Sequence, residues 1–193
     1  MRAAMNLLAV DTTGEALSVA VRAGERLYAF KKVLPKPHDE TLIPAVDKLL
    51  AKAKLTLQDL DAIAAASGPG RFTGIRIGMA YAVVAARCVG KPALAVTRFE
   101  ALAFGRPEPR LCAVLEGFRG EKYYQLFKKG RPEAPPVWVR EMPEVDAPIV
   151  TGDPGAEGLL GPSARQLALK RRPPFEPLYL KPAGYELPAR AAR

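Results

Sequence analysis

The sequence predicts an α/β protein built on a mixed β-sheet, followed by a smaller and less regular part. Three strand patterns joined by tight turns open the chain, and an amphipathic helical pattern follows them. A fully apolar run of strand length then leads through a glycine-rich turn into a second helical pattern. The predicted order is β-β-β-α-β-α-β-α over about the first hundred residues, which combines an antiparallel meander with parallel crossovers.

The meander is expected at residues 6–10, 17–22 and 27–33, with short turns between the strands. Apolar residues then recur at helical spacing over residues 42–53. Pro44 falls in the first turn of this helix, where its missing N–H group removes no hydrogen bond. The pattern therefore changes from strand to helix at about residue 40.

The next elements alternate between strand and helix. Residues 62–67 are apolar or small throughout, as in a central parallel strand. A helix is expected over residues 70–88, a strand over 93–97 and a short helix over 99–104. These two strand–helix units complete the first predicted domain, residues 1–104.

The remainder of the chain, residues 105–193, is predicted to form a smaller, irregular domain. It begins with glycine and prolines of hinge-like composition and is rich in proline throughout. The elements expected in it are strands at 111–115, 123–127, 137–140 and 149–151, and a short helix at 164–169. The sequence therefore predicts two domains of unequal regularity.

The chain has 193 residues, a formal net charge of +9 and a pI near 9.7. This charge favours an anionic partner, with nucleic acid as the first candidate, although a merely solvated basic surface explains it equally well. Cys88 and Cys112 lie in apolar runs without metal-ligand spacing, so both are expected as buried free thiols in a reducing compartment. No signal-peptide pattern opens the chain, and Arg76 and Arg87 interrupt its most apolar helix, so a cytoplasmic protein away from membranes is expected.

The residues of the second helix show a row of small side chains at every fourth position. Gly70, Gly74 and Gly78 begin this row. Glycine inside a helix costs about 1 kcal/mol relative to alanine, so these glycines require a structural reason. Residues four apart lie in one line on a helix, so the row predicts a shallow groove against which something packs closely.

Several motifs together resemble the TsaB (YeaZ) family over nearly the whole chain. The matching segments are residues 9–12, His38 with residues 42–44, 68–78, 116–124, 149–153 and 177–180. The resemblance implies an actin-like ATPase fold (the ASKHA group, ribonuclease H-like) with two lobes, the second one reduced here. Residues 116–118 read Glu-Gly-Phe where the family usually has Asp-Ala-Arg, so no role is assigned to that segment.

The resemblance also implies a function in making threonylcarbamoyladenosine beside the tRNA anticodon. TsaB in bacteria is the non-catalytic partner of its paralogue TsaD, and the ATPase TsaE joins them. The expected protein is therefore a scaffold or activator that meets tRNA only indirectly or through the complex. Two alternatives are a stand-alone actin-like ATPase or kinase acting through Asp11 and an RNA-binding protein using residues 170–172.

The residues offer little catalytic machinery of their own. Catalytic paralogues hold a metal ion with two histidines four positions apart, whereas this chain has His38 and then Leu42, so no metal site is expected. Asp11, Thr12 and Thr13 occupy the turn at which actin-like ATPases bind phosphate and magnesium. Nucleotide binding there, or ATP or ADP with magnesium at an interface, is one interpretation, and an inherited structural turn is the other.

The family pairs through the two helices of its first lobe, and the homodimer and the heterodimer with TsaD use the same surface. The apolar arc of the second helix is wider than one sheet face covers, which favours a partner, although a helix buried on both sides within one domain is the alternative. The residues expected to contact a partner are Leu42, Val46, Thr73, Arg76, Ile77, Ala80 and Val84.

Overall fold

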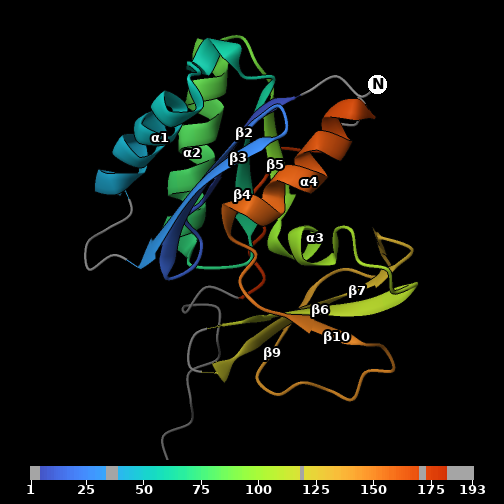
Figure 1. Ribbon diagram of the computed structural model, residues 1–193. Coiled ribbons are helices and arrows are strands. Elements are labelled where there is room, and N and C mark those ends of the chain that lie inside the picture. Colours follow the sequence, from blue (N-terminus) through green and yellow to red (C-terminus); the bar gives the residue numbers. More distant parts are fainter. Residues whose placement is uncertain (1–4, 34–38, 118–119, 170–172, 182–193) are drawn as a thin grey trace, which may run out of the picture.

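The computed structural model describes residues 5–33, 39–117, 120–169 and 173–181. These residues form two five-stranded sheets, and the first sheet comes from the N-terminal part of the chain (Figure 1). The strand order of this first sheet is β3-β2-β1-β4-β5, in which β1–β3 form an antiparallel meander and β4 and β5 run parallel to β1. The bounds are Asn6–Asp11 (β1), Ala16–Ala23 (β2), Arg26–Val33 (β3), Ala62–Gly68 (β4) and Ala93–Thr97 (β5). The strands β1 and β4 are buried almost throughout, as central strands must be.

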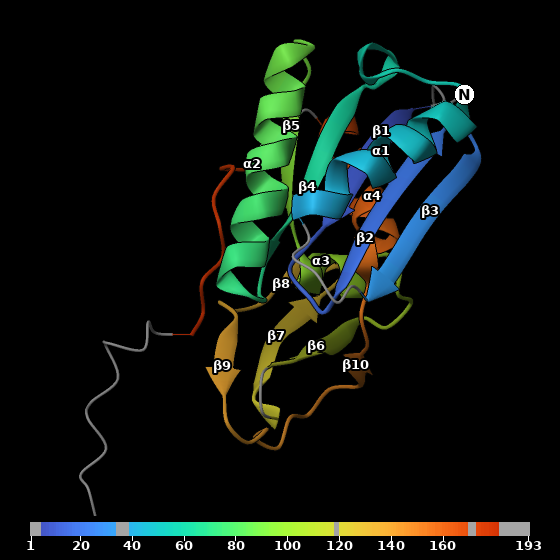
Figure 2. The same cartoon turned by 90° about the vertical axis from the view of Figure 1, so that its left-hand side faces the viewer.

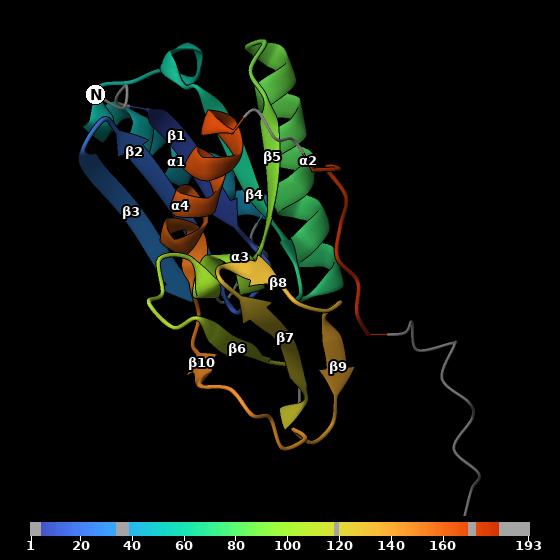
Figure 3. The ribbon, with the colours of Figure 1, turned by 90° about the vertical axis from the view of Figure 1, so that its right-hand side faces the viewer.

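Helices cover both faces of this sheet (Figures 2 and 3). Helices α1 (Asp39–Ala53) and α2 (Phe72–Cys88) share one hydrophobic core with the sheet, in which Leu49 and Ile75 are buried. Helix α4 (Gly155–Ala168) packs on the opposite face through Leu159 and Leu160. The sheet is therefore the middle layer of a three-layer arrangement.

A second sheet lies below the first in Figure 1 and has the order β10-β6-β7-β8, with β9 paired to β7. The bounds are Arg110–Glu116 (β6), Lys122–Lys128 (β7), Arg131–Pro132 (β8), Val137–Val139 (β9) and Ile149–Thr151 (β10). Helix α3 (Arg98–Ala103) packs on this sheet, and the buried Phe99 contributes to its core. A one-turn helix, η1 (Leu57–Asp59), precedes β4.

The order of elements predicted for residues 1–104 is the order observed. Helix α2 begins at Phe72, however, so the prediction that Gly70 lies in this helix is wrong. Cys112 is buried as expected, whereas the prediction for Cys88 is wrong, because this free cysteine is exposed at the last residue of α2. No helix among the described residues combines the length and the hydropathy needed to cross a bilayer.

Helix α4 begins nine residues before the predicted helix at 164–169. The prediction is too short because the first half of α4 contains glycines, which ordinarily disfavour a helix. A Cβ atom on Gly158 would lie 2.8 Å from Pro154 Cβ, and one on Gly161 would lie 2.5 Å from Phe104 Cδ1. Close packing therefore accounts for both glycines. The division predicted after residue 104 stays a prediction, and α4, although it lies beyond that division, packs on the first sheet.

Candidate functional site

The turn after β1 is buried at the centre of the molecule. Asp11, Thr12 and Thr13 are each at most 2% exposed. Asp11 Oδ1 accepts hydrogen bonds from the Thr13 backbone N–H (2.9 Å) and from Thr13 Oγ1 (2.6 Å), and Thr12 Oγ1 donates to the Gly74 carbonyl (2.6 Å). The polar atoms predicted to bind a nucleotide thus make bonds within the fold. Nucleotide binding at this turn stays a prediction.

The glycine row is the surface on which this turn rests. A Cβ atom on Gly70 would lie 2.5 Å from the Thr13 carbonyl oxygen, and one on Gly78 would lie 2.6 Å from Thr12 Oγ1. A Cβ atom on Gly74 would overlap the Thr12 carbonyl oxygen. The element that packs closely against the row is therefore the turn after β1 of the same chain.

We predict that Gly74→Ala lowers the free energy of unfolding by about 3 kcal/mol, because backbone atoms of the turn cannot move aside for the added methyl group. Urea unfolding monitored by circular dichroism measures the change. The neighbouring exposed Thr73 provides the control, since Thr73→Ala is expected to change the value by less than about 0.5 kcal/mol. Equal stability of the two variants would contradict the close packing.

Arg98 joins the turn to the segment before α4. Arg98 is the first residue of α3 and is only 7% exposed. Arg98 Nε lies 3.5 Å from Asp11 Oδ2, Nη2 lies 2.8 Å from Asp153 Oδ1, and Nη1 donates to the Pro69 carbonyl (3.4 Å). Lys31 Nζ adds a second cation 3.0 Å from Asp153 Oδ2. Two carboxylates and two cations thus form one ion-pair cluster.

The turn at Asp11 and the segment of residues 152–155 before α4 therefore meet through this guanidinium. Asp153 also accepts from the Gly155 backbone N–H at the start of α4. Sequence reasoning missed Arg98, although an arginine directly after a buried strand and beside the apolar Phe99 is a signal of a buried partner. The described residues hold no group of three or more metal-ligating side chains, and His38 lies outside them.

The cluster makes stability dependent on pH. Burial raises the pKa of Asp153, but the hydrogen bond from Lys31 and the charge of Arg98 outweigh it, so the pKa lies below its ordinary value of 3.8. A carboxyl group with a depressed pKa stabilises the fold above 3.8 and loses that contribution as the pH falls through the folded-state pKa.

We therefore predict that, below pH 3.8, the stability of the Asp153→Asn variant falls less steeply with decreasing pH than that of the wild type. Melting temperatures of the wild type and the variant, measured from pH 7 to pH 2, test this. Glu157→Gln on the first turn of α4 is the matched control and should leave the wild-type slope in place. Parallel acid limbs in wild type and Asp153→Asn would contradict the assignment.

The outer face of α2 is exposed and partly apolar. Of the predicted contact residues, Thr73, Arg76, Ala80 and Val84 lie on this face, and Ile77 is half-buried. Val84 is 60% exposed and Val83 is 41% exposed. Burial and the carboxylate of Asp47 on α1 raise the pKa of the half-buried Tyr81 to about 12, so its hydroxyl stays neutral beside this face.

The prediction for α1 is wrong in detail, because Leu42 and Val46 are buried against the sheet and cannot reach a partner. The exposed side of α1 carries Ile43 and Asp47 instead. Helical spacing identified two rows on this helix but did not identify which row faces inward.

The segment 173–181 runs along the N-terminal end of α2 and contacts the outer face of the helix there. The Leu178 backbone N–H donates to the Ser67 carbonyl at the end of β4 (2.7 Å). The Tyr179 ring lies 4.8 Å from the Phe72 ring, its hydroxyl accepts from Arg76 Nε (3.2 Å), and the Arg76 guanidinium lies 3.9 Å above the Phe72 ring. Arg76, predicted to contact a partner, is therefore already oriented by its own chain.

Comparisons with known proteins agree with this architecture. Residues 32–134 match the family described as TsaD: tRNA N6-adenosine threonylcarbamoyltransferase. The solved structure of YeaZ from Pseudomonas aeruginosa superposes with a TM-score of 0.78 at 27% identity, over 91% of this chain and 100% of that chain.

Two of the relatives that match in sequence show the range of coverage. The tRNA threonylcarbamoyladenosine biosynthesis protein TsaB of Escherichia coli is 31% identical over 129 residues, which is 65% of this chain and 56% of that protein. An uncharacterized protein of Mycobacterium tuberculosis is 32% identical over 182 residues, which is 92% of this chain and 82% of that protein.

The layered sheet with its β-β-β-α-β-α-β-α order defines the class as the actin-like ATPase fold, and the predicted fold class is confirmed. Within that class the chain belongs to the TsaB (YeaZ) family. The chain spans about half the length of several curated relatives that it matches, namely 56% of the Escherichia coli protein and 48% of a Mycobacterium leprae protein.

Proposed function

We propose that this chain acts in tRNA threonylcarbamoyladenosine biosynthesis as a non-catalytic subunit that binds the paralogue TsaD through the outer face of α2. Val84, exposed with Val83 and Ala80 on that face, is the observation that carries the proposal. Covering apolar side chains on one exposed helix face with a partner removes them from water, which favours association. Thr73, Arg76 and Ile77 extend the contact toward the N-terminal end of the helix.

The state of Asp11 supports a role without catalysis. Its carboxylate is 2% exposed, accepts two hydrogen bonds from Thr13 and faces the Arg98 guanidinium. A carboxylate held in this way has a cation of the protein itself beside it, where an ATPase would require magnesium. ATP or ADP with magnesium remains part of the proposal only at the interface with a partner.

The proposal includes TsaE as a further component of the complex, a homodimer that uses the same helix face, and tRNA bound through the complex. Homodimer and heterodimer then compete, because one exposed face cannot be covered twice. The net charge of +9 is consistent with a complex that approaches tRNA.

Co-purification with TsaD followed by a modification assay tests the proposal. The expected result is a one-to-one complex, and threonylcarbamoyladenosine that appears in tRNA only when this chain, TsaD and TsaE are combined. The chain alone with ATP and magnesium should show no turnover. ATP hydrolysis by the isolated chain that disappears in Asp11→Ala would instead assign it an activity of its own.

A further inference from the structure

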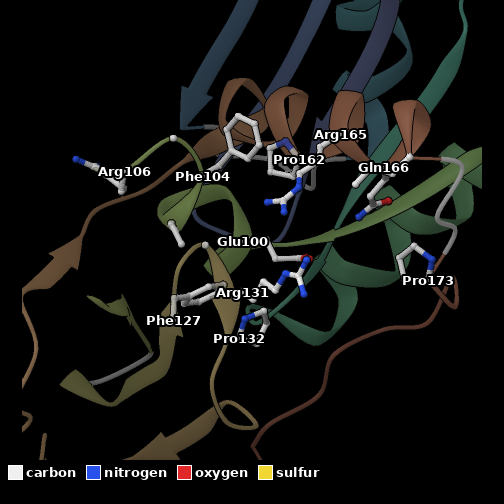
Figure 4. Close-up of a pocket in the computed structure, with 14 residues that line it drawn as sticks. Glu100, Phe104, Arg106, Phe127, Arg131, Pro132, Pro162, Arg165, Gln166 and Pro173 are labelled. Carbon is white, nitrogen blue, oxygen red and sulfur yellow. The ribbon is translucent and has the colours of Figure 1, made fainter. Parts of the chain in front are cut away.

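A cavity of about 500 Å³ is lined by residues of α3, α4, β7 and β8 (Figure 4). Helix α4 lies on the side of the first sheet opposite α2 (Figure 3). Ligand sites for small molecules occupy roughly 300–1,000 Å³, so this cavity has room for one. Its apolar wall includes Phe104, Pro132 and Pro162. Neither the Asp11 turn nor the α2 face belongs to it.

The polar groups of the cavity converge from different elements. Figure 4 shows Arg165 of α4, Arg131 of β8 and Glu100 of α3 directed into the space, whereas Arg106 at its rim points away. The guanidinium groups of Arg131 and Arg165 form no ion pair with any other residue that the structure describes. Two guanidinium groups in this arrangement suit a phosphate, whose oxygens accept several N–H bonds.

The buried Gln166 leaves one hydrogen-bond acceptor without a donor in the part of the chain that the structure describes. The residue is 8% exposed, and its Nε2 donates to the Ala95 carbonyl (3.1 Å). Its Oε1 is buried and accepts no hydrogen bond from the described residues, although it lines the cavity. A buried acceptor without a donor costs about 1–3 kcal/mol, so a ligand with an N–H or O–H group would remove this penalty.

We propose that the cavity binds a nucleoside monophosphate. Its phosphate pairs with Arg131 and Arg165, and a base amine or ribose hydroxyl donates to Gln166 Oε1. The Glu100 carboxylate lines the same space and opposes the higher negative charge of a di- or triphosphate. A ligand of amino-acid size would leave much of the cavity empty. This inference is independent of the proposed role in tRNA modification.

Isothermal titration of the full chain with AMP, adenosine and inorganic phosphate tests the proposal. AMP is expected to bind about tenfold or more tightly than either fragment, because only AMP reaches both ends of the cavity. Arg131→Ala and Arg165→Ala should each weaken AMP binding about tenfold and leave adenosine unchanged. Gln166→Leu should weaken the binding of AMP and of adenosine and leave the binding of phosphate unchanged. Arg87→Ala, at an exposed site on α2, is the charge-matched control and should bind AMP like the wild type.

The exposed positions of Arg131 and Arg165 make their variants informative even if Gln166→Leu does not fold. Absence of saturable AMP binding at millimolar concentration would overturn the proposal, as would AMP binding that both arginine variants leave intact. Equal affinity for AMP and inorganic phosphate would identify an anion site only and would overturn the nucleotide assignment.

Discussion

Under the proposed function, the Val84→Arg variant is expected to lose binding to TsaD and, with it, tRNA modification. Val84 is 60% exposed on the outer face of α2, so the free chain accommodates arginine there without strain. At a covered apolar interface the same guanidinium would be desolvated without a partner charge. We expect affinity for TsaD to fall about 30-fold or more, as at interface hot spots. Size-exclusion co-elution and mass spectrometry of tRNA nucleosides measure the two effects.

Val33→Arg is the matched control for this experiment. Val33 is 65% exposed at the end of β3, which is the edge of the first sheet farthest from β5. Helix α2 packs on β4 and β5, so the two sites lie on different parts of the molecule. Val33→Arg should keep both the complex and the modification. If Val84→Arg also keeps both, while its thermal unfolding matches the wild type, the α2 face is not the site of pairing.

The first half of the fold could be predicted because each of its elements has a distinct local signal. The strand β4 is apolar throughout, and the helix α1 repeats its apolar residues at helical spacing. The helix α4 lacks such a signal, since Gly158 and Gly161 disfavour a helix in isolation. Only the contacts with Pro154 and Phe104 explain these glycines, and those contacts are formed by tertiary packing.

The candidate site was less predictable for a related reason. The glycine row indicated close packing, but Thr12 and Thr13, which pack on it, lie about sixty positions earlier in the chain. The choice of Leu42 and Val46 as surface residues was wrong because periodicity defines a helical face without orienting it. Arg98 was missed because its two carboxylate partners come from distant segments.

The Arg98→Met variant is expected to lower the free energy of unfolding by about 3–5 kcal/mol, because it leaves the Asp11 carboxylate buried without its cation. Methionine retains much of the length and volume of the arginine stem, so a cavity contributes little to the loss. Urea unfolding at pH 7 measures the effect. Arg87→Met at an exposed position of α2 is the control, with an expected change below about 0.5 kcal/mol.

A double variant separates loss of charge pairing from loss of packing. Asp11→Asn in the Arg98→Met background removes the uncompensated charge, so it should recover part of the stability that Arg98→Met loses. In the wild-type background the same Asp11→Asn change should destabilise, because Arg98 then lacks one of its two carboxylates. If Asp11→Asn has the same effect in both backgrounds, Arg98 acts by packing alone. The opposite signs expected here would mean that the turn used for phosphate in an actin-like ATPase is held in this chain by an internal ion pair.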